Sequence, residues 1–187
     1  MANSPAPPSP AGADETTRIL HRITPLKDWA APANAGWPHM KIAVLDLETT
    51  GLDPQYDDII ELSIATTDID DQGQIIAIEG LRSGLQQPSR PIAPDISAIT
   101  GITDEMVTGE RIGPNAVAEH LARVDACLSF NVQFDRRHLE QLVPEVGSMP
   151  WICAAADVPW RTLGFDGRAQ GYLLMQSGRF NPTAHRA

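Results

Sequence analysis

Residues 41–54 read KIAVLDLETTGLDP, and this stretch decides the fold that the sequence predicts. The apolar run at its start has the length of a buried strand, and the Thr-Thr-Gly-Leu-Asp-Pro cluster after it is typical of a turn. Residues two apart on a strand face the same side, so Asp46 and Glu48 share one face while Leu45 and Leu47 point into the core. Two neighbouring carboxylates repel each other unless a cation neutralises them, and their oxygens suit Mg²⁺ or Mn²⁺. The stretch indicates either a metal site or a strand end whose acids face solvent.

The remaining pattern predicts an α/β layer fold. Residues 59–69 and 74–81 are typical of two more strands, and the polar turn between them indicates a hairpin, so the first three strands form an antiparallel meander. Two further strands and several helices follow, which together predict a mixed sheet flanked by helices. We expect helices over 114–124, after Asn131, near 159–163 and over 169–176, short helical turns over 96–107, and strands over 126–130 and 150–156.

Composition limits the class of protein. Residues 1–38 contain seven prolines and predict a disordered Pro/Ala-rich tail with one docking turn, ahead of a folded domain over 39–187. No apolar run approaches the roughly 18 residues of a membrane span, and no secretory signal is present, so we expect a cytoplasmic protein with no membrane partner. The net charge of −10 argues against nucleic acid. Acids that bind metal ions count toward that charge, however, and residues 126–187 carry six bases against five acids.

A third acid follows the short strand over 126–130. In the sequence Asn131-Val-Gln-Phe134-Asp135, the residue Asn131 is typical of a helix cap, which puts Asp135 in the first helical turn. The carboxyl ends of sheet strands are where α/β proteins usually build their sites. The alternative is an Asp that only complements the helix dipole. His185 is a lone histidine, which gains a role only as a general base beside a metal site.

Together these blocks resemble the DnaQ-like, DEDDh-type 3′–5′ exonucleases, the family of the proofreading epsilon subunit of bacterial DNA polymerase III. Four blocks stand in the family's order. Residues 44–54 look like its first exonuclease motif, and residues 99–107 look like its nucleotide-side segment. Residues 131–135 look like the second motif, and residues 184–187 look like the start of the third.

The resemblance implies a ribonuclease H-like fold and a role for each matching residue. Asp46, Glu48 and Asp135 would hold two divalent cations, Mg²⁺ or Mn²⁺, and His185 would deprotonate the attacking water. The implied reaction is hydrolysis of the terminal phosphodiester at a single-stranded DNA 3′ end, in proofreading or repair, with a DNA polymerase as a candidate partner. The residues expected on the substrate side are Thr49, Thr50, Gly51, Leu52, Thr100, Gly101, Asn131 and Phe134.

Three departures from the family pattern leave alternatives open. Phe130 stands where the family often has a histidine, the fourth carboxylate would fall at position 190, and the helix expected after His185 is missing. We therefore expect a C-terminally incomplete domain that is nearly inactive as a 187-residue chain and active when extended with an Asp at position 190. The alternatives are a non-catalytic nucleic-acid-binding or polymerase-associated module with a decayed site, and RNA as the substrate.

Overall fold

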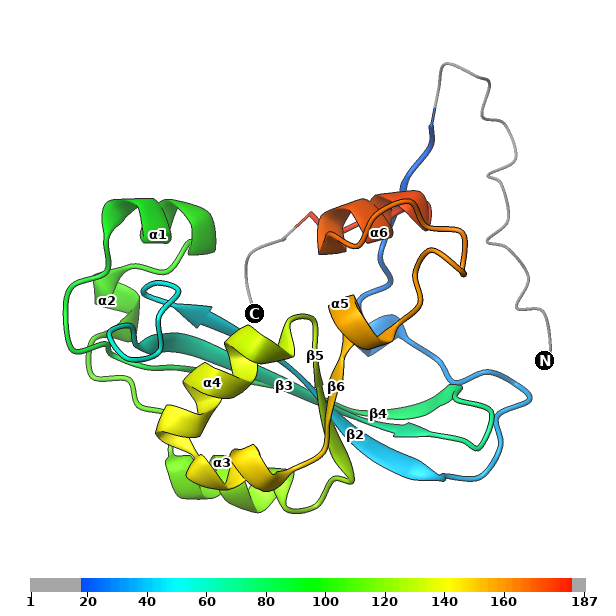
Figure 1. Cartoon of the computed structure of the whole chain (residues 1–187), viewed down its shortest axis with the longest axis horizontal. Coiled ribbons are helices and arrows are strands. Elements are labelled where there is room, and N and C mark those ends of the chain that lie inside the picture. The colour runs from blue at the N-terminus through cyan, green and yellow to red at the C-terminus, as the bar shows by residue number, and fades with distance from the viewer. Residues whose placement is uncertain (1–17, 183–187) are drawn as a thin grey trace.

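The structure is a computed structural model that describes residues 18–182. Its centre is one five-stranded sheet built from β2 (Met40–Thr49), β3 (Ile59–Ile69), β4 (Ile75–Leu85), β5 (Ala126–Ser129) and β6 (Trp151–Cys153). The strand order is β4-β3-β2-β5-β6 (Figure 1). The first three strands pair antiparallel, whereas β2, β5 and β6 run parallel. The predicted mixed sheet, a meander plus two further strands, is confirmed.

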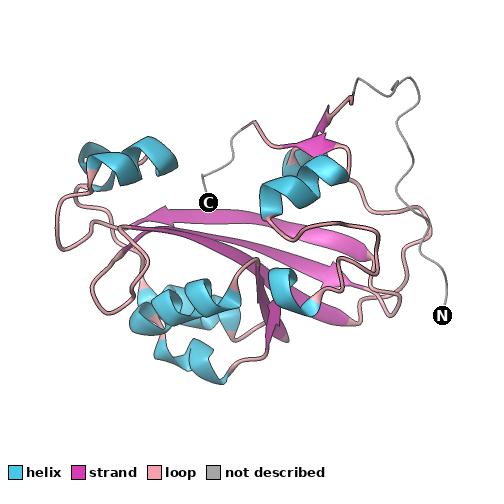
Figure 2. Ribbon diagram, turned by 45° about the horizontal axis from the view of Figure 1, so that its top comes forward, coloured by secondary structure: helices cyan, strands magenta, loops and turns pink. Residues whose placement is uncertain are grey.

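Short helices connect the strands. They are α1 (Pro94–Thr100), α2 (Asp104–Val107), α3 (Pro114–Leu121), α4 (Val132–Leu142), α5 (Ala154–Asp157) and α6 (Gln170–Gln176), with the 3-10 turn η2 (Pro144–Ser148) after α4. Parallel strands need a long crossover connection, and α1 to α3 supply it between β4 and β5. Two views show α3 and α4 on one face of the sheet and α6 on the other (Figures 1 and 2).

The main hydrophobic core fills the space between the sheet and the pair α3 and α4. Leu45 and Leu47 are buried in it, which confirms that these residues of β2 point inward. Leu121 of α3 and Leu139 of α4 close the same core from the helix side. The opposite face of β2 carries Val44, Asp46 and Glu48, because side chains alternate along a strand. The core therefore fixes which face of the sheet presents the acids.

An irregularity in the pairing of β2 with β3 reorganises the end of the sheet where these acids lie. The register shifts between Glu48 and Thr49, so that Ile60 has no direct partner on β2. Ile59 and the residue three positions later, Leu62, both pack in the main core, whereas Ile60 packs in a second cluster with residues of the α1–α2 region. A β-bulge has this effect, because one extra residue resets the alternation. The second cluster consists of Ile60, Ile92, Ile102 and Val107, with Leu85 and Ile96 packed against it.

The segment ahead of the sheet is docked on the rest of the protein over its described part, residues 18–38. Its strand β1 (His21–Arg22) pairs in parallel with β7 (Arg179–Phe180), and the 3-10 turn η1 (Leu26–Asp28) follows. Further on, the Gly36 N–H donates to the buried carboxylate of Asp70 at 3.1 Å. These contacts exceed the single docking turn expected within a disordered tail. The domain boundary after residue 38 stays a prediction.

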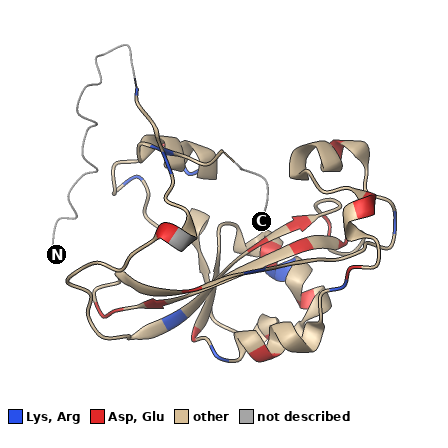
Figure 3. Ribbon diagram, turned by 180° about the vertical axis from the view of Figure 1, so that it is seen from behind, with Lys and Arg blue, Asp and Glu red and all other residues tan. Residues whose placement is uncertain are grey.

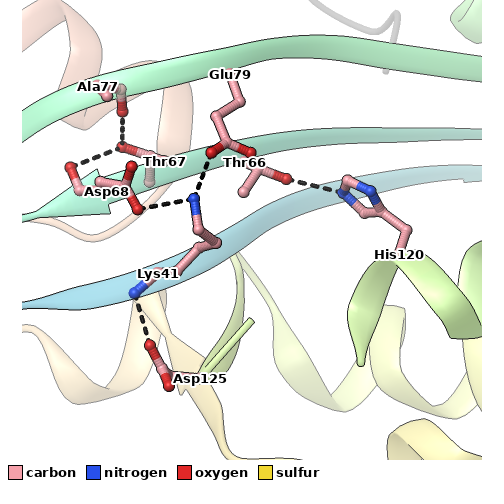
Figure 4. A network of polar contacts seen from close by, with 8 residues as sticks. All are labelled: Lys41, Thr66, Thr67, Asp68, Ala77, Glu79, His120 and Asp125. Carbon is pink, nitrogen blue, oxygen red and sulfur yellow. Dashed lines mark hydrogen bonds and ion pairs between the residues drawn. The ribbon is translucent and has the colours of Figure 1, made fainter. Parts of the chain in front are cut away.

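A group of polar contacts, drawn in Figure 4, stabilises the sheet at the amino end of β2. The Lys41 ammonium bridges Asp68 of β3, at 2.8 Å, and Glu79 of β4, and these hydrogen bonds raise the pKa of Lys41. The Lys41 backbone N–H donates to the Asp125 carboxylate at 2.8 Å, just before β5. On α3, His120 shares a 2.8 Å hydrogen bond with the Thr66 hydroxyl. These contacts thus involve three strands, the residue that precedes β5, and one helix.

Three local predictions differ from the structure. The strand predicted over 150–156 ends at Cys153, because the next four residues form α5. Residues 159–163, predicted as a helical piece, form hydrogen-bonded turns, in which the Leu163 N–H reaches both the Pro159 and the Trp160 carbonyls. Asn131 stands at the N-cap position of α4, but its side chain makes no capping hydrogen bond. Among the described residues, no helix is long and apolar enough to span a membrane.

Candidate active site

Three predicted acids come together at the carboxyl edge of the parallel strands. Asp46 and Glu48 end β2 on the same face, and Asp135 lies in the first turn of α4, directly after β5. Their proximity is visible in their electrostatics, because Asp46 raises the pKa of both Glu48 and Asp135, and Asp135 raises that of Glu48. Asp46 is exposed, Glu48 is half-buried and Asp135 is 3% exposed. The acids therefore extend from the surface inward.

The protein around these carboxylates disfavours their charged forms. Loss of solvation is the largest cause, and it raises the pKa of Glu48 to about 7 and that of Asp135 to about 6. The pKa of Asp46 is raised for the same reason, since surrounding protein removes water even from this exposed residue. Ser129 and backbone N–H groups near Asn131 pull the pKa of Asp135 downward, although the Ser129 hydroxyl does not reach a geometrically good hydrogen bond. The site thus holds negative charge that nothing in the described chain neutralises.

A fourth carboxylate, absent from the sequence-based prediction, belongs to this cluster. Glu61 lies on β3 directly opposite Glu48, and its charge raises the pKa of both Glu48 and Asp46. It is 5% exposed, and its Oε1 accepts a 2.9 Å hydrogen bond from the Ser83 hydroxyl. The signal for it was a charged residue inside the apolar run Ile59-Ile-Glu61-Leu-Ser-Ile64, which a core strand rarely tolerates without a partner.

Several buried polar oxygens around the acids make no hydrogen bond within the described residues. They are Glu61 Oε2, Ser63 Oγ and Ser129 Oγ. Ser63 pairs with Asp46 across the sheet, so at least two of the three lie beside the acids of β2. Buried polar atoms without partners are uncommon, and they point to water or an ion as the missing partner.

The donor set fits a divalent cation of the Mg²⁺ or Mn²⁺ type, because it consists of carboxylate oxygens with uncompensated charge. Within residues 18–182, however, no three His, Cys, Asp or Glu side chains converge closely enough to hold an ion as they stand. His185, the predicted general base, lies outside the described residues. The acids are therefore assembled, without forming a closed coordination shell.

The turn after β2 is rigid, and it contains four of the predicted substrate-side residues. The buried Thr49 hydroxyl donates to the Gly51 carbonyl at 2.6 Å. Thr50 exchanges two 2.9 Å hydrogen bonds with Asp58, one from its backbone and one to its hydroxyl. A Cβ on Gly51 would lie 2.4 Å from Asp57 Oδ2, so any side chain there would force Asp57 out of its place. Leu52 projects from this turn and is 85% exposed.

The other predicted substrate-side residues lie on two helices. The buried Thr100 hydroxyl donates to the Ile96 carbonyl at 2.9 Å inside α1, and Gly101 ends that helix with φ of 72°, a left-handed conformation that favours glycine. Asn131 is exposed at the start of α4. Phe134 is half-buried, with its ring centroid 4.4 Å from that of the buried His138. Their roles toward a substrate stay predictions.

The sheet order and the acids at its carboxyl edge define a ribonuclease H-like protein with the layout of an exonuclease domain. Residues 43–146 match the model of the family RNase_T, described as Exonuclease. The match covers more than half of the chain and includes Asp46, Glu48 and Asp135. The chain belongs to this exonuclease family, and its resemblance to the DnaQ-like exonucleases is confirmed.

Relatives and solved structures agree with this assignment. Over 120 residues the chain is 37% identical to the DNA polymerase III PolC-type of Thermotoga petrophila, a match that covers 63% of this chain but 8% of that protein. The chain thus spans only 6–11% of the length of the curated relatives it matches. Exonuclease X in complex with 5′ overhanging duplex DNA is 28% identical, with a TM-score of 0.52 and coverage of 72% of this chain and 71% of that one. E. coli Exonuclease I in complex with a dA16 oligonucleotide, at 19% identity, shows the shared fold, with a TM-score of 0.60 over 80% of this chain and 38% of that one.

Proposed function

We propose that this chain carries a metal-dependent 3′–5′ exonuclease site that hydrolyses the terminal phosphodiester of DNA. The observation that supports the proposal most is that Asp46, Glu48 and Asp135 lie at one edge of the sheet, where their charges raise the pKa values of Glu48 and Asp135, inside the segment that matches the exonuclease family. A group of acids without neutralising partners is costly to keep in a folded protein, and cation binding gives it a use.

The residues of the chain would divide the work as follows. Asp46, Glu48 and Asp135 would hold the cations, with Glu61 behind Glu48 as a further negative charge. The rigid turn at Thr49 to Leu52 would position the terminal nucleotide, because its backbone is fixed by hydrogen bonds to Asp58 and its exposed leucine is free to contact a base. His185 would accept the proton of the attacking water. When bound, divalent cations would supply Lewis-acid stabilisation of the attacking and leaving oxygens.

The raised pKa values couple cation binding to proton release. With a pKa of about 7, Glu48 is partly protonated at neutral pH, and a cation must displace that proton. Binding should therefore strengthen as pH rises through about 7, since the carboxylates become fully charged. This dependence gives the proposal a readout that does not require turnover.

A DNA substrate and a polymerase partner have weaker support. Exonuclease X was solved with duplex DNA, and the relatives are PolC-type DNA polymerases, so both indications come from other proteins. RNA is the alternative substrate. A non-catalytic module with a decayed site is the alternative function, and the intact acids of the first two motifs count against it.

The test compares strand degradation with cation binding in the same preparations. A single-stranded DNA labelled at the 3′ end or at the 5′ end is incubated with Mg²⁺ or Mn²⁺, while the melting temperature is followed against cation concentration. Because the 187-residue chain is expected to be nearly inactive, the expected result is slow degradation in which the 3′ label is lost first, together with a cation-dependent rise in melting temperature. Asp46→Asn should abolish both responses, whereas Asp71→Asn, in the exposed turn between β3 and β4, should keep both.

The two readouts separate the alternatives. Cation binding without degradation of DNA or RNA in any label arm would favour the decayed-site module. Degradation from the 5′ end would contradict the proposed polarity. If cations did not raise the melting temperature of the parent chain, or raised that of Asp46→Asn equally, the metal-dependent mechanism itself would be overturned.

A further inference from the structure

A concave surface lies between α5 and the start of α6, following β6 at the edge of the sheet that carries the acidic cluster. It is a pocket of about 430 Å³. Its polar lining includes Arg161, Arg168 and Asp166, and its aromatic lining is Trp160. We call this surface the Trp160 pocket. None of its residues was assigned to the proposed catalytic site.

The aromatic wall of the pocket is held firmly. The Trp160 indole N–H donates to the Ala154 carbonyl at 2.7 Å, and the ring packs edge-on against Phe165 at 5.4 Å between centroids, with an interplanar angle of 85°. The Phe165 N–H donates a hydrogen bond to the Trp160 carbonyl at 2.9 Å, and the Gly164 N–H donates one to the Arg161 carbonyl at 3.1 Å. Arg161 therefore projects from a turn whose backbone is already ordered, which lowers the entropy cost of binding a ligand there.

The charge of the pocket is the reverse of that of the whole chain. Arg161 and Arg168 are exposed, and none of the ion pairs among the described residues involves either of them. The single carboxylate of the lining, Asp166, contacts Gln176 through its side chain and its backbone instead. Two free guanidinium groups thus face one engaged carboxylate in a protein of net charge −10. Figure 3 shows basic positions on the segment between α5 and α6, and acidic ones on the sheet, α1 and α2.

The topology brings this pocket to the same edge of the sheet as the acids. β2, β5 and β6 run parallel, so their carboxyl ends share one edge. The first lining residue, Ala155, donates its N–H to the Phe130 carbonyl at 2.9 Å. Phe130 directly precedes the segment that carries Asp135. A nucleic-acid strand that extends from the acidic cluster along this edge would therefore reach the Trp160 pocket.

We infer that the Trp160 pocket binds a single-stranded nucleic acid upstream of its scissile end, with the two arginines on a phosphate and the indole against a base. The inference rests on the proposed function. Guanidinium groups bind phosphate through paired N–H donors, and a base stacks on an aromatic ring with little sequence preference. This division of labour lets an acidic protein hold a polyanion, because the attraction comes from a site separate from the acids.

The experiment measures binding of a fluorescein-labelled oligothymidylate by anisotropy in EDTA, where no hydrolysis occurs, over a series of salt concentrations. We expect the variant Arg161→Ala/Arg168→Ala to bind roughly 10-fold more weakly at low salt and to lose about 0.7 of the logarithmic salt slope per phosphate contact removed. The matched control is Arg123→Ala, an exposed arginine after α3 that does not line the pocket. Trp160→Phe tests the aromatic wall while it keeps a ring on Phe165.

A second substrate distinguishes this inference from the proposed function. The p-nitrophenyl ester of thymidine 5′-monophosphate occupies the acidic cluster alone, so its cation-dependent hydrolysis should be equal in the double variant and the parent chain. Weaker oligothymidylate binding with unchanged ester hydrolysis would support the pocket. Equal oligothymidylate binding by the double variant and the parent would overturn the inference and leave the exonuclease proposal standing. If the parent chain neither binds the strand nor hydrolyses the ester, both proposals fail.

Discussion

Replacing Asp135 with asparagine should make the cation-free protein more stable. Asp135 is 3% exposed, and its pKa rises from an ordinary 3.8 to about 6, chiefly through lost solvation and secondly through the charge of Asp46. A rise of this size corresponds to about 3 kcal/mol of unfavourable free energy in the charged state. Asparagine removes the charge but keeps the shape, so part of this penalty should disappear.

The gain in stability from Asp135→Asn should increase with pH. An acid whose pKa is higher in the folded than in the unfolded state binds its proton more tightly when folded, so it destabilises the fold once it ionises. For Asp135 the penalty is absent below about pH 4, grows as pH rises, and is complete above about pH 6. Asp135→Asn should match the parent near pH 4 and exceed it by about 1–3 kcal/mol near pH 8, the lower bound allowing for the new amide's own hydrogen-bond needs.

The assay is thermal and denaturant unfolding in EDTA at a series of pH values, followed by a cation titration. For a chain of this size, 1 kcal/mol moves the melting temperature by about 2–4 °C, so the difference near pH 8 is readily measured. Cations should stabilise the parent and leave Asp135→Asn unaffected. Asp71→Asn, an exposed change of the same chemistry, should show no pH-dependent gain. A gain that is equal at all pH values, or no gain near pH 8, would refute the reasoning.

Three further predictions concern neighbouring features. Gly51→Ala should lower the free energy of unfolding by about 1–2 kcal/mol, because its Cβ would lie 2.4 Å from Asp57 Oδ2; a denaturant midpoint equal to the parent's would contradict the contact. Glu61→Gln should lower the pKa of Glu48 from about 7, since it removes a nearby negative charge. A carbon-13 NMR titration in which the pKa of Glu48 is unchanged would show that the two carboxylates do not interact. Leu139→Ala should cost about 2–5 kcal/mol by opening a cavity in the main core, measured by circular dichroism melts, and a loss below about 1 kcal/mol would mean that the site collapses freely.

The sequence predicted the acids of β2 well because alternation is a strong local signal. Leu45 and Leu47 bury one face, so Asp46 and Glu48 had to share the other. Asp135 followed from the same logic at the end of β5. Glu61 was harder, since its place beside Glu48 depends on the strand register and on a bulge that resets the alternation of β3. Periodicity within one strand cannot predict where a partner strand inserts an extra residue.

The predictions that concern long-range contacts show a different limit. The pairing of β1 with β7 joins residues from opposite ends of the described chain over a two-residue ladder, and a ladder that short has no periodicity to detect. The turns over 159–163 show helical spacing, yet Gly164 adopts φ of 89° and ends the segment. In the first case a tertiary contact decided the structure, whereas in the second the left-handed conformation of Gly164 ended the helical segment.

The electrostatics of the two candidate sites give the net charge a physical meaning. A cluster that disfavours its own ionisation repels a phosphodiester until cations arrive, so the acidic cluster alone is poor at capturing a strand. The Trp160 pocket supplies attraction at the same edge of the sheet, and it does so without cations. Capture and hydrolysis would then respond differently to conditions. Salt should weaken capture, because it screens the arginines, whereas lower pH should weaken cation loading, because it protonates Glu48.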